Sequence, residues 1–385
     1  MKKKILVFTG SRADYGLLKP LIKLISKSSK ASLVLVAAGQ HFSKTYGSTY
    51  REILEDKFKI NYLSKINLGE TKDLKILDYI SQSLIDFSKY LKKNRPDMVI
   101  LLGDRYEVYS FCISCFFLNI PITHIHGGEI TTGAFDDSLR HSITKMSNFH
   151  FSCHKNYRSR IIRLGENPKF VFNYGSLGVE NAIKINHIDK KKLFKKFSVP
   201  LNKKCFLVTY HPETKKIGNL KKEINIFLSA IKDFKDVFFI FTYSNSDPFG
   251  KYYIEQILKL KKSRQNMLIV PSLGSRYYLS FLKNCDCIIG NSSSGIIEAP
   301  ALKTPTINIG QRQDGREFSI SILTCKNNRL KIKKLIKKVI LNNNKIKFDN
   351  LFFEKDTSRK IFNKILEISS NLNKSSFRKY FYEKK

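Results

Sequence analysis

The sequence lacks any apolar stretch that approaches the length needed to span a bilayer. Residues 1–4 (MKKK) resemble the charged start of a signal peptide, but the apolar segment that follows, residues 5–9, is too short for a signal-peptide core. That segment runs directly into a polar turn beginning at Gly10. We therefore expect a soluble, cytoplasmic protein with no membrane partner.

A disulfide framework is also missing. The 7 cysteines are odd in number and dispersed along the chain, unlike the paired cysteines of small secreted proteins. Cys112 and Cys115 form one C-x-x-C, but their neighbours are apolar and no second cysteine pair completes a zinc site. We predict that both thiols are buried in a helix, and no spacing of His and Cys points to a metal.

Two common nucleotide-binding signatures are absent. No Gly-x-Gly-x-x-Gly follows the first expected strand, and the sequence contains no P-loop. These absences argue against a nicotinamide-dependent dehydrogenase and against a P-loop NTPase.

Acidic residues are scarce: 32 Asp and Glu stand against 69 Lys and Arg, which gives a net charge of +37. Such a charge can indicate a nucleic-acid-binding protein without catalysis, or attraction to an anionic membrane surface. Beyond residue 326, however, the lysines alternate with Ile and Leu at helical spacing, as on the solvated face of an amphipathic helix. No nucleic-acid-binding module is recognisable, so we expect no nucleic-acid partner. A positive field would also favour an acidic, phosphate-bearing substrate.

What is present is an alternation of strands and helices over a length that suits two domains. This pattern predicts parallel β-α-β units, hence an α/β fold of two doubly wound domains flanking a cleft. We assign residues 1–177 to a first domain, 177–200 to a connection, 201–357 to a second domain and 358–385 to a polar helical tail. The expected strands span residues 4–9, 32–38, 98–102, 122–125, 205–210, 237–243, 267–270, 287–289 and 306–309, with helices at 17–26, 76–91, 106–118 and 223–234.

One strand end is typical of a phosphate-binding turn. The apolar run 287–289 is followed by Gly-Asn-Ser-Ser-Ser-Gly and then by a helical start. Small residues let the backbone approach an anion, and the free N–H groups of a first helical turn point at it. Glu298, about one turn further on, could accept hydrogen bonds from a ribose diol. A capped helix without a ligand would explain the same residues, because Ser is a common N-cap.

Other polar clusters follow other expected strands, and ligands of such sheets bind at the carboxyl ends of the strands. Each cluster also has a structural explanation as a helix cap, a surface ion pair or a buried histidine. Together they place several carboxylates, two histidines and several arginines along one cleft edge, which suits proton transfer at a sugar ring with phosphate held nearby. The candidates are Arg12, Asp104, His126, Glu129, Asp136, His211 and Arg312.

These motifs, in this order, resemble those of the hydrolysing UDP-N-acetylglucosamine 2-epimerases of bacterial sialic acid synthesis. The matching segments run from residue 10 to residue 316 and read GSRADYG, LGDRYE, HIHGGE, RHSITKMS, GSLGVEN, YHPET, GNSSSG and INIGQRQDGR. Each is weak alone, but the set is specific; the last seventy or so residues contribute no motif.

The resemblance implies a GT-B-like fold, in which two Rossmann-like domains flank the cleft and the C-terminal helix crosses back onto the first domain. It implies conversion of UDP-GlcNAc and water into N-acetylmannosamine and UDP, through a 2-acetamidoglucal, with no metal and no cofactor. A homo-oligomer, dimer or tetramer, is expected from the family. Three alternatives stay open: the same reaction on a 2,4-diacetamido-2,4,6-trideoxyhexose nucleotide of the legionaminic acid pathway, a non-hydrolysing epimerase, and a glycosyltransferase on the same fold.

Site residues carried over by motif position fall into two groups. Asp104, Asp136 and His211 are acid/base and substrate-positioning candidates. Some relatives place a catalytic Glu where this chain has His126, so that role falls to His126 or to Glu129. The nucleotide-sugar group comprises Arg12, the turn of Ser292, Ser293, Ser294 and Gly295, Glu298 for the ribose, Arg312, and either Tyr277 or Tyr278 to stack on uracil.

Overall fold

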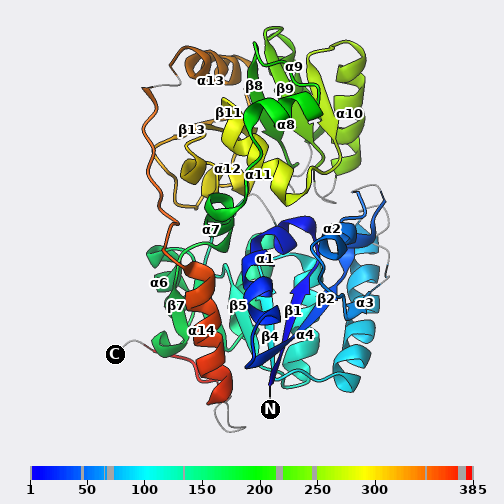
Figure 1. Cartoon of the computed structure of the whole chain (residues 1–385), viewed down its shortest axis with the longest axis vertical. Helices are drawn as coiled ribbons and strands as arrows, with labels where there is room; N and C mark the ends of the chain where they lie inside the picture. Colours follow the sequence, from blue (N-terminus) through cyan, green and yellow to red (C-terminus); the bar gives the residue numbers. More distant parts are fainter. Residues whose placement is uncertain are drawn as a thin grey trace.

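The computed structural model describes residues 2–44, 47–64, 66, 73–132, 135–213, 220–244, 249–342, 345–371 and 379–383. Thr214, the last residue of the YHPET motif, lies outside these ranges. Two α/β domains are stacked along the long axis of the molecule (Figure 1). Each is built on one parallel sheet, which confirms the predicted fold class.

The first domain contains a seven-stranded sheet in the order β3-β2-β1-β4-β5-β6-β7. The chain adds strands to one side of β1 and then, from β4 onward, to the other side. The boundary between β1 and β4 is therefore the topological switch point of a doubly wound sheet, where ligands bind at the carboxyl ends of the strands. The strands are β1 (Lys3–Thr9), β2 (Ala31–Ala37), β3 (Tyr62–Leu63), β4 (Met98–Leu102), β5 (Ile122–Ile125), β6 (Phe149–Ser152) and β7 (Val171–Asn173).

The second domain repeats the arrangement with six strands in the order β10-β9-β8-β11-β12-β13. Its switch point lies between β8 and β11, so Thr209 at the end of β8 is paired with Gly290 at the end of β11. The strands are β8 (Lys204–Thr209), β9 (Val237–Thr242), β10 (Met267–Val270), β11 (Cys287–Gly290), β12 (Thr306–Ile309) and β13 (Ile322–Cys325).

Helices cover both faces of each sheet, and the strands read as apolar runs because both of their faces are buried. The helices are α1 (Arg12–Ser26), α2 (Tyr50–Glu55), α3 (Asp73–Lys93), α4 (Tyr106–Phe117), α5 (Asp136–Met146), α6 (Lys155–Arg163), α7 (Leu177–Lys184), α8 (Lys190–Lys196), α9 (Leu220–Lys232), α10 (Gly250–Lys262), α11 (Gly274–Asn284), α12 (Ser293–Ile297), α13 (Arg329–Asn342) and α14 (Thr357–Ser370).

The start of α1 differs from the expectation. The helix begins at Arg12 rather than at residue 17, because the Ser11 side chain accepts the N–H of Asp14 and caps it. Arg12 is thus fixed on the first turn of a helix, directly beyond the carboxyl end of β1.

The region 177–200, expected to be a connection, is largely helical. Leu177 and Val179 of α7 are buried, and Leu193 and Phe194 of α8 belong to the hydrophobic core of the second domain. Around α8 the two apolar residues stand between four charged residues, 189–192, and two more, 195–196, so the pattern indicates a solvated segment although one face of the short helix is buried.

The C-terminal helix α14 returns to the first domain. It contacts α1 and α7, and Ile361 and Ile365 join the core around β1. Figure 1 shows α14 running alongside the first domain.

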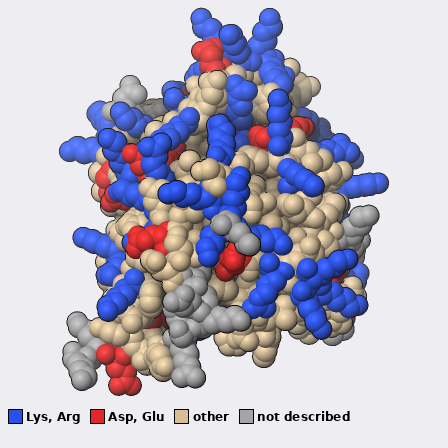
Figure 2. Space-filling model, turned by 60° about the horizontal axis from the view of Figure 1, so that its bottom comes forward, with Lys and Arg blue, Asp and Glu red and all other residues tan. Residues whose placement is uncertain are grey.

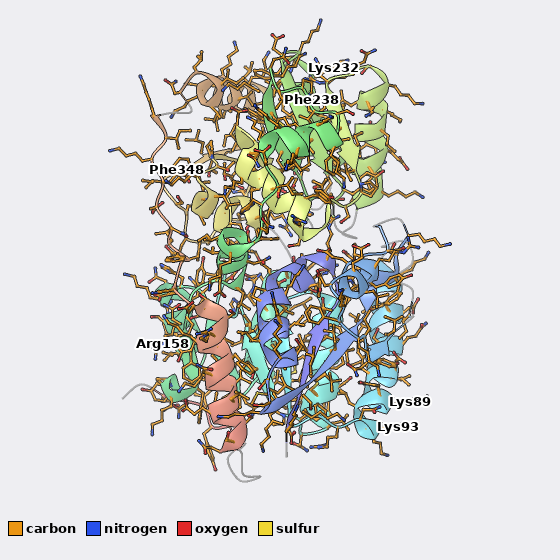
Figure 3. The ribbon with its side chains drawn as sticks, in the orientation of Figure 1. Lys89, Lys93, Arg158, Lys232, Phe238 and Phe348 are labelled. Carbon is orange, nitrogen blue, oxygen red and sulfur yellow. The ribbon has the colours of Figure 1, made fainter. Side chains whose placement is uncertain are left out.

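Lysine and arginine are dispersed over the surface. In Figure 2 they are scattered over the visible face, between areas of other residues, without forming a single patch. Exposed Lys89 and Lys93 lie at one end of the long axis and Lys232 at the other (Figure 3). In α13 the buried side chains are Ile332, Ile336 and Val339, whereas most of its lysines are exposed; this confirms the predicted amphipathic helix.

The thiols follow the prediction. All seven cysteines are free, and Cys112 and Cys115 of α4 are buried in the first domain's core. Within the described part of the chain, no helix combines the length and apolarity that a membrane crossing needs.

Candidate active site

A cavity of about 200 Å³ lies between the two domains. Its walls come from the ends of β8 and β9, from the turn after β11 and from the starts of α1, α7, α11 and α12. The lining residues are Arg12, Ala13, Gly16, Leu17, Gly178, Asn181, Thr209, His211, Thr242, Ser272, Leu273, Gly274, Ser275, Tyr278, Leu279, Ser292, Ser293, Ser294, Glu298 and Arg312.

The turn between β11 and α12 forms one wall. Gly290 has φ +143°, and a Cβ there would overlap the Thr209 carbonyl, so only glycine allows this approach of two strand ends. Ser292 caps α12 by accepting the N–H of Ser294 at 3.3 Å, while Ser293 and Ser294 face the cavity. Gly295 lies outside the lining and allows close packing of α12 on Thr306.

Arg12 forms the opposite wall and joins the domains. Its guanidinium donates hydrogen bonds to the carbonyl oxygens of Pro271 at 2.6 Å and Tyr243 at 3.0 Å. Burial lowers the pKa of Arg12, but the group remains a cation at neutral pH because its pKa starts so high. A partly buried cation beside a turn of small residues suits a pyrophosphate.

The Asn291 side chain holds the backbone of His211 at the cavity through two hydrogen bonds. The His211 N–H donates to Asn291 Oδ1 at 2.7 Å, and Asn291 Nδ2 donates to the His211 carbonyl at 2.8 Å. Burial, together with the positive charges of Arg312, Arg12 and Arg105, holds the pKa of His211 well below its usual value. The imidazole is therefore held in its neutral form.

Glu298 closes the cavity floor. Its side chain lies against Gly178, where a Cβ would overlap the carboxylate, and it is only 7% exposed. Burial raises the pKa of Glu298 to about 7, although His126 and Arg316 oppose the shift.

This shift predicts a pH-dependent stability. A carboxyl group with a raised pKa stabilises the fold fully below its unfolded value of 4.5, and the contribution is lost as the pH rises toward about 7. Between these limits the stability of the wild type should fall relative to Glu298→Gln by on the order of 3 kcal/mol. Urea unfolding of both proteins at pH 5 and pH 7.5 measures this difference; parallel changes in the two proteins would contradict the assignment.

The two tyrosine candidates for uracil stacking point in different directions. Tyr278 lines the cavity, whereas the ring of Tyr277 packs edge-on against Phe197 at 5.2 Å and beneath the Lys196 ammonium at 4.5 Å. Successive residues of α11 point about 100° apart. Tyr277 therefore packs against the α8 region, and of the pair only Tyr278 is placed to meet a ligand in this cavity.

A second cluster, at the carboxyl ends of β4 and β5, centres on the buried Arg140 of α5. Its guanidinium pairs with Asp104 and donates to the Glu129 carbonyl at 2.9 Å and the Thr131 hydroxyl at 3.1 Å. Burial opposes the charge of Arg140, but Asp104 and Glu129 outweigh it and raise its pKa. The Asp104 carboxylate is thus fixed at the rim by a permanent cation.

His126 and Glu129 act as a pair. The His126 Nδ1 lies 2.6 Å from Glu129 Oε1, and the Arg316 guanidinium lies 2.6 Å from Glu129 Oε2. Burial raises the pKa of Glu129, but Arg316 and His126 outweigh burial and hold it well below its usual value. A carboxylate at Nδ1 fixes the imidazole tautomer, which leaves Nε2 as an acceptor; that atom is buried without a hydrogen-bond partner among the described residues.

Three potential metal donors, His126, Glu129 and Cys153, lie within 4.8 Å of one another. They do not fit a metal centre, because the Arg316 cation already occupies the second oxygen of Glu129. Burial also raises the pKa of the Cys153 thiol well above its usual value, so no thiolate is offered.

Arg312 bridges the cavity and the second cluster. It lines the cavity, donates to the Asn291 carbonyl at 3.3 Å, and lies 3.7 Å from the Asp136 carboxylate. Of the sequence candidates, Arg12, His211, Tyr278, Ser292, Ser293, Ser294, Glu298 and Arg312 line the cavity, while Asp104, His126, Glu129 and Asp136 belong to the adjoining cluster.

Sequence reasoning missed several residues of this arrangement. Gly178 and Asn181 line the cavity from α7, inside the segment expected to be a connection, although the GSLGVEN motif contains both. Asn291 joins His211, Arg312 and Gln313, whose amide donates to the Asn291 carbonyl at 2.7 Å. Its position inside GNSSSG was the available signal.

The chain matches known proteins over most of its length. Residues 23–366 match the family model described as UDP-N-acetylglucosamine 2-epimerase. The GDP/UDP-N,N'-diacetylbacillosamine 2-epimerase (hydrolyzing) of Campylobacter jejuni is 41% identical over 331 residues, which is 86% of each chain. The polysialic acid biosynthesis protein P7 of Escherichia coli is 41% identical over 322 residues, 83% of this chain and 82% of that protein.

Solved structures agree on the fold. The UDP-GlcNAc 2-epimerase from Neisseria meningitidis, crystallised with UDP-GlcNAc, superposes with a TM-score of 0.80 at 17% identity and covers 94% of this chain and all of its own. The expected GT-B-like architecture is confirmed. With this fold, a cavity between the domains and a family match over nearly the whole chain, the protein belongs to the UDP-N-acetylglucosamine 2-epimerase family.

Proposed function

We propose that the protein is a hydrolysing 2-epimerase that converts UDP-GlcNAc and water into N-acetylmannosamine and UDP. The observation that carries the proposal is the adjacency of two differently equipped sites. A cavity with Arg12 and the Ser292–Ser294 turn suits a nucleoside diphosphate, and Arg312 connects it to the carboxylate cluster at Asp136. The reacting sugar would then lie between them.

The reaction needs a base for the C2 proton and charge support for the UDP that leaves C1. Arg12 and Arg312 supply positive charge where the pyrophosphate departs, and both are partly shielded from solvent, which strengthens the interaction. Loss of the proton and of UDP leaves a 2-acetamidoglucal, and water then adds across its double bond with inverted configuration at C2.

We assign proton transfer to two kinds of group, a carboxylate and an imidazole. Asp104, paired with Arg140, is the carboxylate candidate together with Asp136. For the position in which relatives carry Glu, we assign the proton-transfer atom to His126 Nε2, with Glu129 orienting the ring through Nδ1. Both residues then take part: His126 contacts the substrate, and Glu129 holds the His126 imidazole in position.

UDP should raise the melting temperature of the wild type, because a ligand that binds only the folded state stabilises it. Glu298→Ala should lose most of that shift, since the ribose loses its acceptor. Arg12→Ala should weaken binding of UDP more than that of uridine, because its proposed partner is phosphate. Thermal unfolding with each ligand measures both effects; an undiminished UDP shift in Glu298→Ala would reject the ribose assignment.

A UDP-sugar with acetamido groups at C2 and C4 is the second candidate substrate. We include it because such a sugar appears in the names of the Campylobacter jejuni relative and of a Legionella pneumophila protein, a UDP-N,N'-diacetylbacillosamine 2-epimerase (hydrolyzing), 30% identical over 94% of this chain and 95% of its own. Incubation with each UDP-sugar and chromatography of the products decides between them. Free UDP with N-acetylmannosamine supports the first substrate, whereas UDP release from the diacetamido sugar alone supports the second. UDP-N-acetylmannosamine without release would identify a non-hydrolysing enzyme instead.

A further inference from the structure

We propose that the C-terminal segment 379–383 is a positioning element for the acid/base cluster, and that Lys379 is its anchor. This inference rests on the proposed function in one respect, since turnover is among its readouts. The segment itself lies outside every motif of the family resemblance.

Lys379 caps the C-terminal end of α5. A helix leaves its last carbonyl groups without partners, and a cation placed there satisfies them and complements the helix dipole. The Lys379 ammonium lies 3.3 Å from the carbonyl oxygen of Thr144, 2.6 Å from that of Lys145 and 2.7 Å from that of Ser147.

The same ammonium joins a buried ion cluster. Glu166, 3% exposed, accepts from Lys379 at 2.6 Å and from Lys145 at 2.7 Å, and its Oε2 lies 3.0 Å from His150 Nε2. His150 belongs to β6, so the tail is tied both to α5 and to the sheet beneath it.

Two further contacts hold the segment in place. The Tyr382 N–H donates to the Gly165 carbonyl at 2.9 Å, and the Phe381 ring packs against Gly165, which has φ +84° and no side chain to obstruct it. The Lys145 ammonium lies 5.0 Å from the centre of the Phe381 ring. The docking is therefore specific for Gly165 and the end of α5.

The end of α5 is connected to Asp104 through His124. Burial lowers the pKa of His124 to about 3, so the ring is neutral. Its Nε2 lies 2.8 Å from the Gly103 carbonyl, which can only accept, so Nδ1 must accept from the Thr144 hydroxyl at 3.1 Å. Thr144 is one of the residues whose carbonyl Lys379 holds, and Gly103 directly precedes Asp104.

The N-terminal part of α5 also contacts Asp104, because Arg140 pairs with its carboxylate. Asp104 is thus set by two points on one helix, and Lys379 fixes the position of that helix. The nucleotide cavity does not include any residue of α5. A displaced tail should therefore impair the chemical step more than nucleotide binding.

The test compares Lys379→Met, which keeps the apolar stem and removes the ammonium, with Lys360→Met. Lys360 is also a C-terminal lysine in an ion pair, with Glu354 at 3.1 Å, but it lies on α14 away from α5. We expect Lys379→Met to lower kcat about tenfold, with KM and the UDP-induced shift of Tm within twofold of wild type, because a small misplacement of a catalytic group costs rate rather than affinity. Lys379→Arg should recover part of kcat, and Lys360→Met should match the wild type.

Hydrogen exchange gives a readout that does not depend on turnover. Amides of residues 140–147 should exchange faster in Lys379→Met than in the wild type or Lys360→Met. Phe381→Ala, a change at a largely exposed ring, provides a second variant that should fold and show a smaller effect in the same direction.

An unchanged kcat in Lys379→Met or Phe381→Ala would overturn the proposal, as would a parallel loss of kcat and of the UDP-induced shift. Unaltered exchange in α5 would overturn it as well. A wild type that releases UDP from neither UDP-sugar would instead refute the proposed function, and the exchange experiment would still test the role of the tail.

Discussion

Asp104→Asn should lower turnover of the UDP-sugar by about 10² to 10⁴-fold, the usual cost of losing a positioned acid or base. The substitution is nearly isosteric, so it removes proton transfer and negative charge with little change in packing. Asp136→Asn should behave alike, although Asp136 is held less tightly, with its carboxylate 3.7 Å from Arg312. UDP release measured at saturating substrate gives the rate of each variant.

Asp97→Asn is the matched control for Asp104→Asn. Asp97 is exposed, directly precedes β4 and accepts the Lys4 N–H at 2.7 Å, whereas Asp104 follows the same strand at its carboxyl end. The control should retain wild-type turnover. If Asp104→Asn also kept near-native activity with an unchanged circular dichroism spectrum, its role would reduce to holding Arg140.

The sequence was sufficient for the long, apolar elements of the fold. Every predicted strand occurs within one or two residues of its expected bounds, because a buried parallel strand is an uninterrupted apolar run. Four short strands were not predicted, β3, β6, β7 and β13. In β6 the residues His150 and Ser152 break the apolar run, yet both are buried because Glu166 and the Phe172 carbonyl satisfy their polar atoms.

The site was predictable in part for the same reason. The polar residues that follow strands were visible, because the carboxyl ends of parallel strands meet at one edge. What the sequence could not provide was pairing across long separations. Nothing local indicates that Asp104 meets Arg140, or that Glu129 meets Arg316 from the other domain.

The tyrosines illustrate the same limit. Tyr277 and Tyr278 are adjacent in sequence and equally able to stack on a base, and only the rotation of α11 separates them. Likewise, His126 and Glu129 looked like alternatives, whereas the 2.6 Å contact between them makes them one unit.

Glu129→Met should lower the free energy of unfolding by about 3 to 5 kcal/mol, the cost of leaving a buried charge without its partner. The Arg316 side chain is 8% exposed, and two of its three guanidinium nitrogens have no hydrogen-bond partner among the described residues. Removal of Glu129 therefore leaves the buried Arg316 cation without its carboxylate partner. Urea unfolding at pH 7 measures the change.

The double variant Glu129→Met with Arg316→Met distinguishes an unpaired charge from lost packing. Because a buried ion pair replaced by apolar side chains of similar volume is often close to neutral, the double variant should be more stable than Glu129→Met alone. Arg329→Met, which breaks an exposed pair with Asp233, should leave the unfolding midpoint unchanged. A double variant less stable than Glu129→Met would show that packing, not charge, dominates at this position.

The pH dependence of the stability difference between the wild type and Glu129→Met gives an independent check. The pKa of Glu129 is held below its usual value in the folded protein, because Arg316 and His126 outweigh burial. A group with a depressed pKa stabilises the fold above its unfolded value of 4.5 and loses that contribution as the pH falls toward the folded value. The stability gap between wild type and Glu129→Met should therefore narrow steadily below pH 4.5. A gap that stayed constant down to the acid unfolding of the wild type would mean that the carboxylate charge contributes nothing, and that Glu129 orients His126 without stabilising the junction of the two domains.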